Sequence, residues 1–331
     1  MKIDLDSDPR LRQVNEWLTA ILPDRDFELK VASSDASFRR YFRVYQHGQS
    51  RIVMDAPPEH EDIEAFVRVA EFLAGSGTHV PHIYARNVEL GFLLLSDLGT
   101  TSYLSALNQD SADRLYQAAI DEIIKMQLAP VSEIELPAYD DEKLLSEMRL
   151  FPDWFLERHL SLAVPSDLDS IFELLLDNAN SQPQFFVHRD YHSRNLMLGP
   201  DNEVGVIDFQ DAVIGPATYD LVSLLRDCYV EWPQTKIEQW LDYYYQQAQN
   251  QQLMTGIDRS AFVRWFDLMG LQRHLKVLGI FCRLNYRDGK SGYMKDLPLT
   301  LKYVLQVTAR YPALASLHQF LTQSPKIMAI L

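Results

Sequence analysis

Nine residues near the middle of the chain carry its most informative pattern: Val187-His188-Arg189-Asp190-Tyr191-His192-Ser193-Arg194-Asn195. A histidine, an aspartate and an asparagine stand there at the spacing H-x-D-x-x-x-x-N. In phosphoryl transfer, a carboxylate accepts the proton of the acceptor hydroxyl and a nearby amide oxygen helps to hold Mg²⁺. The spacing makes Asp190 a candidate base and Asn195 a candidate metal ligand. The competing interpretation is that both side chains only cap turns.

A second acid supports the chemical interpretation. Asp208 follows Asp190 by 18 residues and ends the apolar run Val204-Gly205-Val206-Ile207. A carboxylate at the end of a buried strand is costly unless it binds a cation, so Asp208 is the candidate for a second Mg²⁺ ligand. The alternative is that it starts a turn. Asp220, near the start of a later helix, is expected to brace the loop through backbone hydrogen bonds.

Three further residues of the nine-residue stretch have expected roles. Arg194 places a cation where it could offset charge that develops on the transferring phosphoryl group. His192 could contact the acceptor hydroxyl. His188 is expected to hold the loop through hydrogen bonds, because the proton transfer is already assigned to Asp190.

The chain around this stretch divides by periodicity. An opening helix is expected over residues 10–22, with a second helix over 63–73 among short β-prone runs at 27–32, 40–45, 51–54, 82–85 and 92–95. After Gly99, helical spacing dominates over 102–126, 141–159, 168–178, 216–227, 234–249 and 261–285. Two β-prone runs, 184–187 and 204–209, bracket the polar stretch. The sequence predicts an α+β protein with a sheet lobe over 1–99 and a mainly helical lobe over 100–331.

Composition narrows the function classes. The chain has 331 residues and a net charge of 31 − 46 = −15, which argues against nucleic acid and anionic membranes as partners. A small phosphorylated ligand stays open, because local groups can hold one. The two cysteines, Cys228 and Cys282, have no metal-ligand spacing. Without a secretory signal or a run of about 18 apolar residues, the protein is expected in the cytoplasm.

These motifs resemble the aminoglycoside phosphotransferase and choline kinase family, which has the protein-kinase-like fold. The resemblance runs from about Leu29 to about Pro298. It implies two lobes with ATP between them, Mg²⁺ on the phosphates, and a hinge at Leu95-Ser96-Asp97-Leu98-Gly99 whose backbone binds adenine. Ser96 and Leu98 are the expected nucleotide contacts in that hinge.

A closer resemblance is to the bacterial anomeric kinases of N-acetylmuramate and N-acetylglucosamine. It rests on four segments outside the shared motif: Ser34 to Arg43, Met54-Asp55-Ala56-Pro57-Pro58, Leu150-Phe151-Pro152-Asp153-Trp154-Phe155 and Gly270 to Lys276. It implies ATP-dependent phosphorylation of the sugar's C1 hydroxyl in peptidoglycan recycling. A kinase of the same fold with an antibiotic, choline or another sugar as acceptor is the first alternative.

Two departures from the family pattern leave a second alternative, a nucleotide-binding pseudokinase. Residues 32–41 contain no glycine, so Ser34, Ser37 and backbone amides would have to cradle the phosphates. Met54 stands where the family often has a phosphate-pairing lysine. Arg43 or Arg40 is expected to supply that charge, although either could be a solvated arginine on an edge strand. Strand alternation allows only one of them to reach the nucleotide.

The acceptor site is expected along the helix at 261–285. Apolar residues lie around most of this helix, which predicts that it is buried. Gln272, Lys276, Gly279 and Arg283 fall within a stripe of roughly 60° on that helix, so this stripe should face water or a cleft. Arg287 and Lys290 follow in a turn-rich loop. Such cations suit an anionic sugar better than a polycationic antibiotic. Trp154 and Trp265 could stack on a sugar ring or simply belong to the core.

Overall fold

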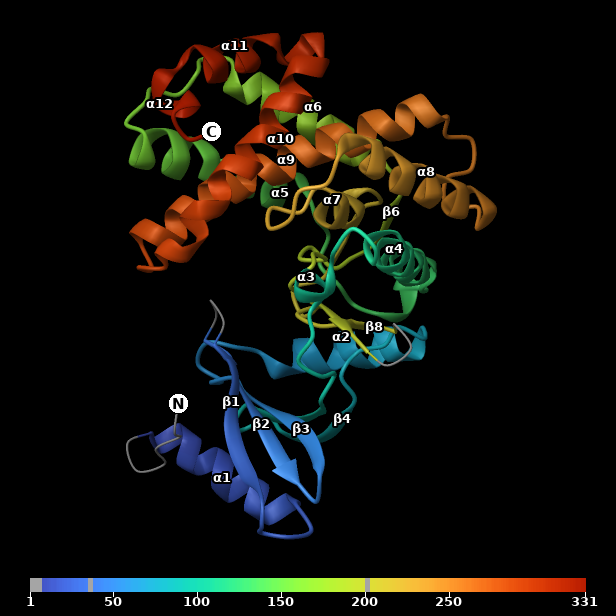
Figure 1. Ribbon diagram of the computed structural model, residues 1–331, viewed down its shortest axis with the longest axis vertical. Coiled ribbons are helices and arrows are strands. Elements are labelled where there is room, and N and C mark those ends of the chain that lie inside the picture. The colour runs from blue at the N-terminus through green and yellow to red at the C-terminus, as the bar shows by residue number, and fades with distance from the viewer. Residues whose placement is uncertain (1–7, 35–37, 200–202) are drawn as a thin grey trace. The chain divides into compact units, whose positions relative to one another are not determined.

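The computed structural model describes residues 8–34, 38–199 and 203–331, and only the backbone of Ser33 and Ser34. The chain divides into two compact units, coloured from blue to red along the chain in Figure 1. The first unit is Met1–Thr101 together with Met197–Asp211, and the second is Ser102–Leu196 together with Ala212–Leu331. The segment 197–211 thus belongs to the first unit. The expected boundary between residues 99 and 100 placed this segment in the other lobe. That lobe boundary stays a prediction.

The first unit is built on an antiparallel sheet with the strand order β1-β2-β3-β5-β4. Its elements, in chain order, are α1 (Pro9–Ile21), β1 (Glu28–Ser34), β2 (Arg40–Gln46), β3 (Gln49–Asp55), α2 (Ile63–Gly75), β4 (Ile83–Asn87), β5 (Phe92–Ser96), β7 (Leu196–Leu198) and β8 (Val204–Val206). The order of three strands, a helix and two strands confirms the expectation for the N-terminal lobe.

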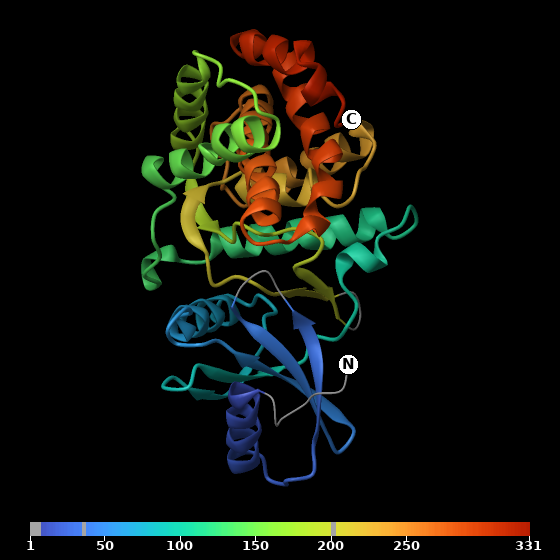
Figure 2. The same cartoon turned by 90° about the vertical axis from the view of Figure 1, so that its left-hand side faces the viewer.

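Helix α1 covers one face of this sheet, as both views show (Figure 1 and Figure 2). The Asp8 side chain accepts the Leu11 amide at 3.1 Å, and Pro9 occupies the first helical turn, so both start signals lie in the sequence. Apolar residues at helical spacing then meet the alternate residues of β2 and β3 in one core: Leu11, Val14, Leu18, Phe42, Val44 and Val53. The apolar residues at helical spacing on α1 thus pack on the alternate apolar residues of one sheet face.

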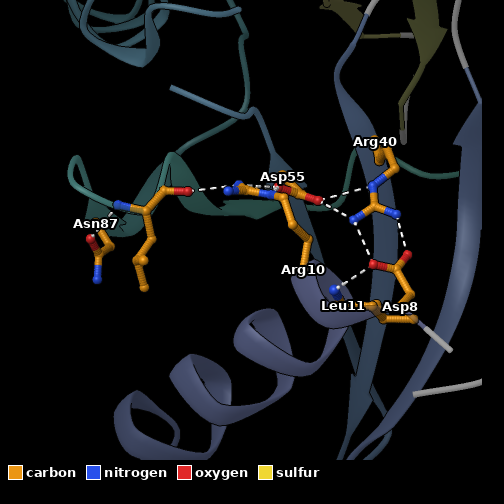
Figure 3. A network of polar contacts seen from close by, with 7 residues as sticks. Asp8, Arg10, Leu11, Arg40, Asp55 and Asn87 are labelled. Carbon is orange, nitrogen blue, oxygen red and sulfur yellow. Dashed lines mark hydrogen bonds and ion pairs between the residues drawn. The ribbon is translucent and has the colours of Figure 1, made fainter. Parts of the chain in front are cut away.

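A polar network ties α1 to the end of β3 (Figure 3). The fully buried Asp55 receives Arg10 Nε at 2.9 Å on one carboxylate oxygen and Arg40 Nε at 2.9 Å on the other. Arg40 also binds Asp8. Arg40 therefore lies on the face that α1 covers, where its charge is shared by two carboxylates. A contact of Arg40 with nucleotide phosphates stays a prediction.

The second unit is mainly helical and is built around one long buried helix, α9. Its elements are α3 (Tyr103–Ala106), α4 (Ala112–Leu128), η1 (Val131–Glu133), α5 (Asp141–Met148), η2 (Phe151–His159), α6 (Leu168–Asn180), β6 (Gln184–Val187), β9 (Val213–Pro216), α7 (Tyr219–Leu225), α8 (Gln234–Asn250), α9 (Arg259–Tyr286), η4 (Ser291–Asp296), α10 (Leu297–Arg310), η5 (Pro312–Leu314), α11 (Ala315–Gln323) and α12 (Pro325–Met328). The expected burial of the helix at 261–285 is confirmed, because α9 is buried over most of its length.

Some expected helices are interrupted for identifiable reasons. The one expected at 141–159 divides into α5 and the π-helix η2, where Pro152 removes an amide donor from the first turn. The one expected at 102–126 divides into α3 and α4. The strands β7 and β9 and the helices α10 to α12 were not foreseen. No helix among the described residues is long and apolar enough to span a membrane.

Candidate active site

The nine-residue stretch forms a loop between two strands. Strand β6 ends at Val187, and the loop continues until β7 begins at Leu196. The entry is fixed because β6 pairs with β9, with Val187 opposite Val213, and both residues are buried. The first half of the loop therefore starts from a rigid, buried strand end.

Asp220, in the first turn of α7, holds the beginning of this loop. Its carboxylate accepts the amide of His188 at 2.7 Å and the amide of Arg189 at 3.0 Å, which confirms the expected bracing role. Burial raises the pKa of Asp220 to about 6, against the two amide hydrogen bonds. Arg189 has φ of +76°, a conformation that costs a non-glycine residue energy and must be maintained by its surroundings.

The end of the loop is held by a second buried carboxylate, Asp227. Asp227 accepts the amide of Ser193 at 3.0 Å and also binds its hydroxyl. Ser193 O in turn accepts the amide of Leu104 at 2.9 Å. Within the loop, Asn195 Nδ2 donates to Asp190 O at 3.0 Å, which orients the amide beside the candidate base. His188 is fully buried, and its Nδ1 accepts the Asp190 amide at 3.3 Å, as expected of a residue that holds the loop.

The electrostatic surroundings of Asp190 favour its ionised form. Burial acts to raise its pKa, but Lys276 and His192, followed by Arg189 and Arg273, bring the pKa below its ordinary value. Asp190 is therefore a carboxylate at neutral pH and can accept a proton. Tyr191 fixes the next position along the loop, because its hydroxyl donates to Ala119 O at 2.9 Å.

A buried ionic cluster lies beside this loop and is centred on Glu147 of α5. Glu147 pairs with Lys276 of α9 at 3.0 Å and forms an ion pair with Arg189. Lys276 also donates to the Tyr219 hydroxyl at 3.1 Å, and the Tyr139 hydroxyl binds Glu147. Burial acts to raise the pKa of Glu147, but Lys276 and Arg189 lower it below its ordinary value. We call this group the Glu147 cluster: Glu147, Lys276, Arg189, Tyr139 and Tyr219.

The expected polar stripe along α9 is not continuous, which corrects the expectation that all of it faces water or a cleft. Gln272 is 1% exposed and Lys276 6% exposed, and Lys276 is engaged in the Glu147 cluster. At Gly279, a Cβ atom would lie 2.3 Å from the Leu150 carbonyl carbon, so this position packs helix against backbone. The physical reason is that a polar or small residue on a helix need not face a ligand. Here Lys276 forms a buried ion pair, and Gly279 allows close packing of the helix.

The remaining candidates for acceptor contacts lie elsewhere on the second unit. Arg283 is half-buried near the end of α9, Arg287 pairs with its neighbour Asp288, and Lys290 follows in the loop before η4. Trp154 lies at the edge of the core cluster around η2. Trp265 is buried. Arg283, Arg287, Lys290 and Trp154 stay predictions as sugar contacts, and the buried Gln272 and Lys276 stay predictions as parts of the acceptor site.

Arg194 lies against two aromatic rings. Its guanidinium is 3.5 Å from the centroid of Tyr229 and 5.9 Å from that of Tyr293, and it faces Asp296 at 4.0 Å. The His192 ring meets Tyr229 edge-on at 5.2 Å. The aromatic contacts hold both side chains on the same side of the loop. The roles expected for Arg194 and His192 stay predictions.

In the first unit, Asp208 follows β8 and its carboxylate is surrounded by polar groups. Its backbone has φ of +66°, and Gln210 Nε2 donates to its Oδ1 at 2.9 Å. Gln210 Oε1 is a buried atom to which the described part of the chain gives no hydrogen-bond partner. The carboxylates of Asp208 and Asp211, which this one amide group joins through its Nε2, supply oxygen ligands of the kind that Mg²⁺ prefers. Asn195 and Asp208 as metal ligands stay predictions.

The expected hinge is held by side chains of the first unit. Arg43 binds Asp97, with Nη2 at 3.0 Å from Oδ1, and donates to Gly99 O at 2.9 Å. Ser96 Oγ accepts the His82 amide at 2.9 Å. Leu98 packs against Gly205, where a Cβ atom would lie 2.9 Å from Leu98 Cδ1. Arg43 thus supports the hinge segment, and its contact with nucleotide, like those of Ser96 and Leu98, stays a prediction.

Two other expected phosphate contacts fall outside what the structure describes. Ser37 lies in the segment 35–37, and for Ser34 the structure gives the backbone at the end of β1 but no side chain. Met54, at the position of the missing lysine, is buried, with Leu93 opposite it on β5.

Comparison with known proteins identifies the family. Residues 28–261 match the model of a family described as a phosphotransferase enzyme family. The chain belongs to this family. The family resemblance drawn from the sequence is therefore confirmed, and this member of the phosphotransferase enzyme family is an enzyme of the kinase type.

Curated relatives of this phosphotransferase match nearly its whole length. It is 46% identical to an N-acetylmuramate/N-acetylglucosamine kinase of Pseudomonas putida, over 96% of this chain and 97% of the relative. It is 39% identical to a kinase of the same name from Neisseria meningitidis, over 94% of this chain and 95% of that one. The relatives thus share more than the catalytic loop.

Solved structures share the fold of this phosphotransferase at low identity. An ethanolamine kinase of Plasmodium vivax has a TM-score of 0.65 at 9% identity, covering 91% of this chain and 87% of its own. A choline kinase of Streptococcus pneumoniae has a TM-score of 0.61 at 12% identity, covering 93% and 100%. The protein-kinase-like fold is confirmed.

Sequence reasoning missed two charged residues of this phosphotransferase. Glu147 follows the buried Leu144 by three positions, so it lies on the core-facing side of α5, where an acid signals a buried ion pair. Arg39 has side-chain nitrogens 3.7 Å from Asp208 Oδ1 and 3.7 Å from Glu61 Oε2. Strand alternation extended back by one residue would have placed Arg39 on the same face as Tyr41 and Arg43.

Proposed function

We propose that this phosphotransferase is an ATP-dependent kinase that phosphorylates the C1 hydroxyl of N-acetylmuramate, N-acetylglucosamine or both. The observation that carries the proposal is the 46% identity, over 96% of the chain, to a kinase named for these two sugars. Because this identity extends far beyond the catalytic loop, it favours the interpretation that the two proteins share an acceptor as well as a fold. The position C1 rests on the resemblance to the anomeric kinases.

Asp190 orients the acceptor hydroxyl and takes its proton. The hydroxyl oxygen forms a bond to the γ-phosphorus of ATP, the bond from that phosphorus to the bridging oxygen breaks, and ADP leaves with the electron pair. The proton of the hydroxyl passes to the Asp190 carboxylate. The lowered pKa of Asp190 keeps this carboxylate ionised at neutral pH, so it is ready to accept the proton.

Asn195 and Asp208 would hold Mg²⁺, which would neutralise charge on the nucleotide phosphates. The hinge 95–99, with Ser96 and Leu98, would bind adenine through its backbone, and Arg43 would keep that segment in place. Ser34 and Ser37 would contact the phosphates. Arg194 would offset charge on the transferring group, because its guanidinium is fixed four residues after the base.

The acceptor would lie beside His192 and the cations at the end of α9. Arg283, Arg287 and Lys290 supply positive charge for the lactyl carboxylate of N-acetylmuramate, and Trp154 supplies an aromatic surface for the ring. Gln272 and Lys276 are both buried, so we do not expect them to touch the sugar. They would affect acceptor binding through the shape and charge of the site. His188 acts by holding the loop.

Both sugars are building blocks of peptidoglycan, so we place the reaction in peptidoglycan recycling. We also propose that the reaction takes place in the cytoplasm, where ATP is available. The substrates are small molecules, and neither nucleic acid nor membrane is an expected partner.

The test is Mg²⁺-dependent ADP release measured in parallel with N-acetylmuramate, N-acetylglucosamine, kanamycin and choline. Turnover of the two amino sugars, with a product as acid-labile as a C1 phosphate should be, supports the proposal. Turnover with kanamycin or choline alone would replace it with another small-molecule kinase. ATP binding without turnover of any acceptor would favour the pseudokinase. The observation behind that alternative is Met54, which stands where the family often has a phosphate-pairing lysine.

A further inference from the structure

Arg39 lies directly before β2 and has a different environment from the other arginines of its strand. Its guanidinium is 3.7 Å from Glu61, just before α2, and 3.7 Å from Asp208, just after β8. The Arg39 side chain is only 11% exposed. Three segments of the first unit thus bring one largely buried cation and two carboxylates together.

The neighbouring arginines of β2 are tightly bound to structural partners. Arg40 hydrogen-bonds Asp55 at 2.9 Å on the face covered by α1, and Arg43 hydrogen-bonds Asp97 and Gly99 in the hinge segment. The ion pairs of Arg39 with Glu61 and Asp208 are longer than hydrogen bonds. Arg39 therefore lies beside the carboxylate that is the candidate metal ligand.

The charge balance around Arg39 changes when a metal binds. Glu61 and Asp208 together carry two negative charges and Arg39 carries one positive charge. A guanidinium is not deprotonated in a folded protein, so Arg39 keeps its charge. A divalent cation on Asp208 would give the group a net positive charge, and a buried positive charge requires an anion.

We propose that Arg39 binds the phosphates of the nucleotide beside the Mg²⁺ held by Asp208, and so supplies the cation that Met54 on β3 cannot. This inference rests on the proposed function, because it assumes that ATP is the donor. The planar guanidinium can contact two phosphate oxygens at once. Glu61 is then the residue that keeps Arg39 in position before the nucleotide arrives.

The alternative is that Arg39 only links α2 to β8 as a structural ion pair. The two roles differ in which ligands they affect. A phosphate-binding arginine matters for ATP and ADP but not for adenosine, whereas a structural ion pair would affect all three ligands through the fold or none of them.

The experiment measures the binding of ATP, ADP and adenosine by calorimetry, with Mg²⁺ and again with EDTA, for the full chain. The variants are Arg39→Met and Arg39→Lys, and the matched control is Arg51→Met on β3, whose guanidinium lies 4.9 Å from the Tyr84 ring. We expect Arg39→Met to weaken ATP binding at least about tenfold both with and without Mg²⁺. Adenosine binding should be unchanged, Arg39→Lys should be intermediate, and Arg51→Met should match the wild type.

Equal ATP affinity in Arg39→Met and the wild type would overturn the inference. An equal loss of adenosine and ATP binding would also overturn it, since that result shows a structural role. If Arg39→Met does not fold, Arg39→Lys decides: unchanged ATP affinity contradicts a bidentate contact, and a selective loss for ATP over adenosine supports it. Failure of the proposed function is separate, because it appears as a wild-type protein that turns over neither sugar.

Discussion

The Asp190 carboxylate is ionised because Lys276 and His192, followed by Arg189 and Arg273, lower its pKa against the effect of its burial. Replacing it with asparagine keeps the size of the side chain but removes the proton acceptor. We expect Asp190→Asn to lower kcat about a thousandfold, as for the loss of a general base, with ATP affinity unchanged. The measurements are steady-state kinetics and calorimetry. Wild-type turnover in this variant would refute the assignment of the base.

Asp208 has a positive φ, so the best variant for testing its charge is one that tolerates this backbone conformation. Asparagine does, whereas alanine would add strain. We expect Asp208→Asn to reduce the gain in ATP affinity that Mg²⁺ provides by at least about tenfold. Binding in EDTA should match the wild type, in contrast to Arg39→Met. An undiminished Mg²⁺ effect would argue against Asp208 as a ligand.

At the scale of elements, the Glu147 cluster joins α5 and α9 to the catalytic loop. Removing one partner of a buried ion pair leaves the others uncompensated. We expect Glu147→Gln to lower the free energy of unfolding by about 3 kcal/mol and also to lower kcat, because Arg189 precedes the base in a strained conformation. The control is Glu142→Gln, an exposed acid on the same helix, which should change little.

The effect of Glu147→Gln should depend on pH. The pKa of Glu147 is below its ordinary value of 4.5 in the folded protein, so the carboxylate stabilises the fold above pH 4.5. That stability is lost as the pH falls through the folded pKa. The difference in unfolding free energy between wild type and variant should therefore be largest near neutral pH and shrink below pH 4.5. A difference that stays constant from pH 7 down to about pH 3 would contradict the ionic role.

The packing of α9 against η2 depends on the absence of a side chain at Gly279. A Cβ atom there would lie 2.3 Å from both the carbon and the oxygen of the Leu150 carbonyl. We expect Gly279→Ala to lower the unfolding free energy by about 2–3 kcal/mol, because backbone has to move. The control is Gly75→Ala at the end of α2, where nothing lies within 4 Å; it should be neutral or slightly stabilising. Denaturant unfolding measures both.

At the scale of the molecule, the sequence predicted the secondary structure and the fold class better than it predicted which charged side chains pair with each other. Capping residues and periodicity are local, so α1, the order of strands and helix along the first 99 residues and the buried α9 could be predicted. Asp220 was predictable because it stands at a helix start near the loop. The pairing of Lys276 with Glu147 was not, because α5 and α9 are distant in sequence and either residue alone suits a surface. Similarly, Arg43 and Arg39 differ only in their tertiary partners.

The return of the chain into the first unit is the other feature that local patterns do not reveal, and it makes a prediction about folding. Residues 197–211 supply Val206, whose amide donates to His79 O at 2.8 Å, and Phe209, whose ring centroid is 4.8 Å from that of Phe66 on α2. Without them, α2 loses a buried partner. We expect a fragment of residues 1–101 to expose apolar surface and to exchange the amide hydrogens of α2 rapidly. A fusion of residues 1–101 to 197–211 through a glycine–serine linker should protect those amides, because it restores both contacts within one unit. Equal protection in the two fragments would mean that the sheet and α1 alone stabilise the unit, and that the returning segment only follows its surface.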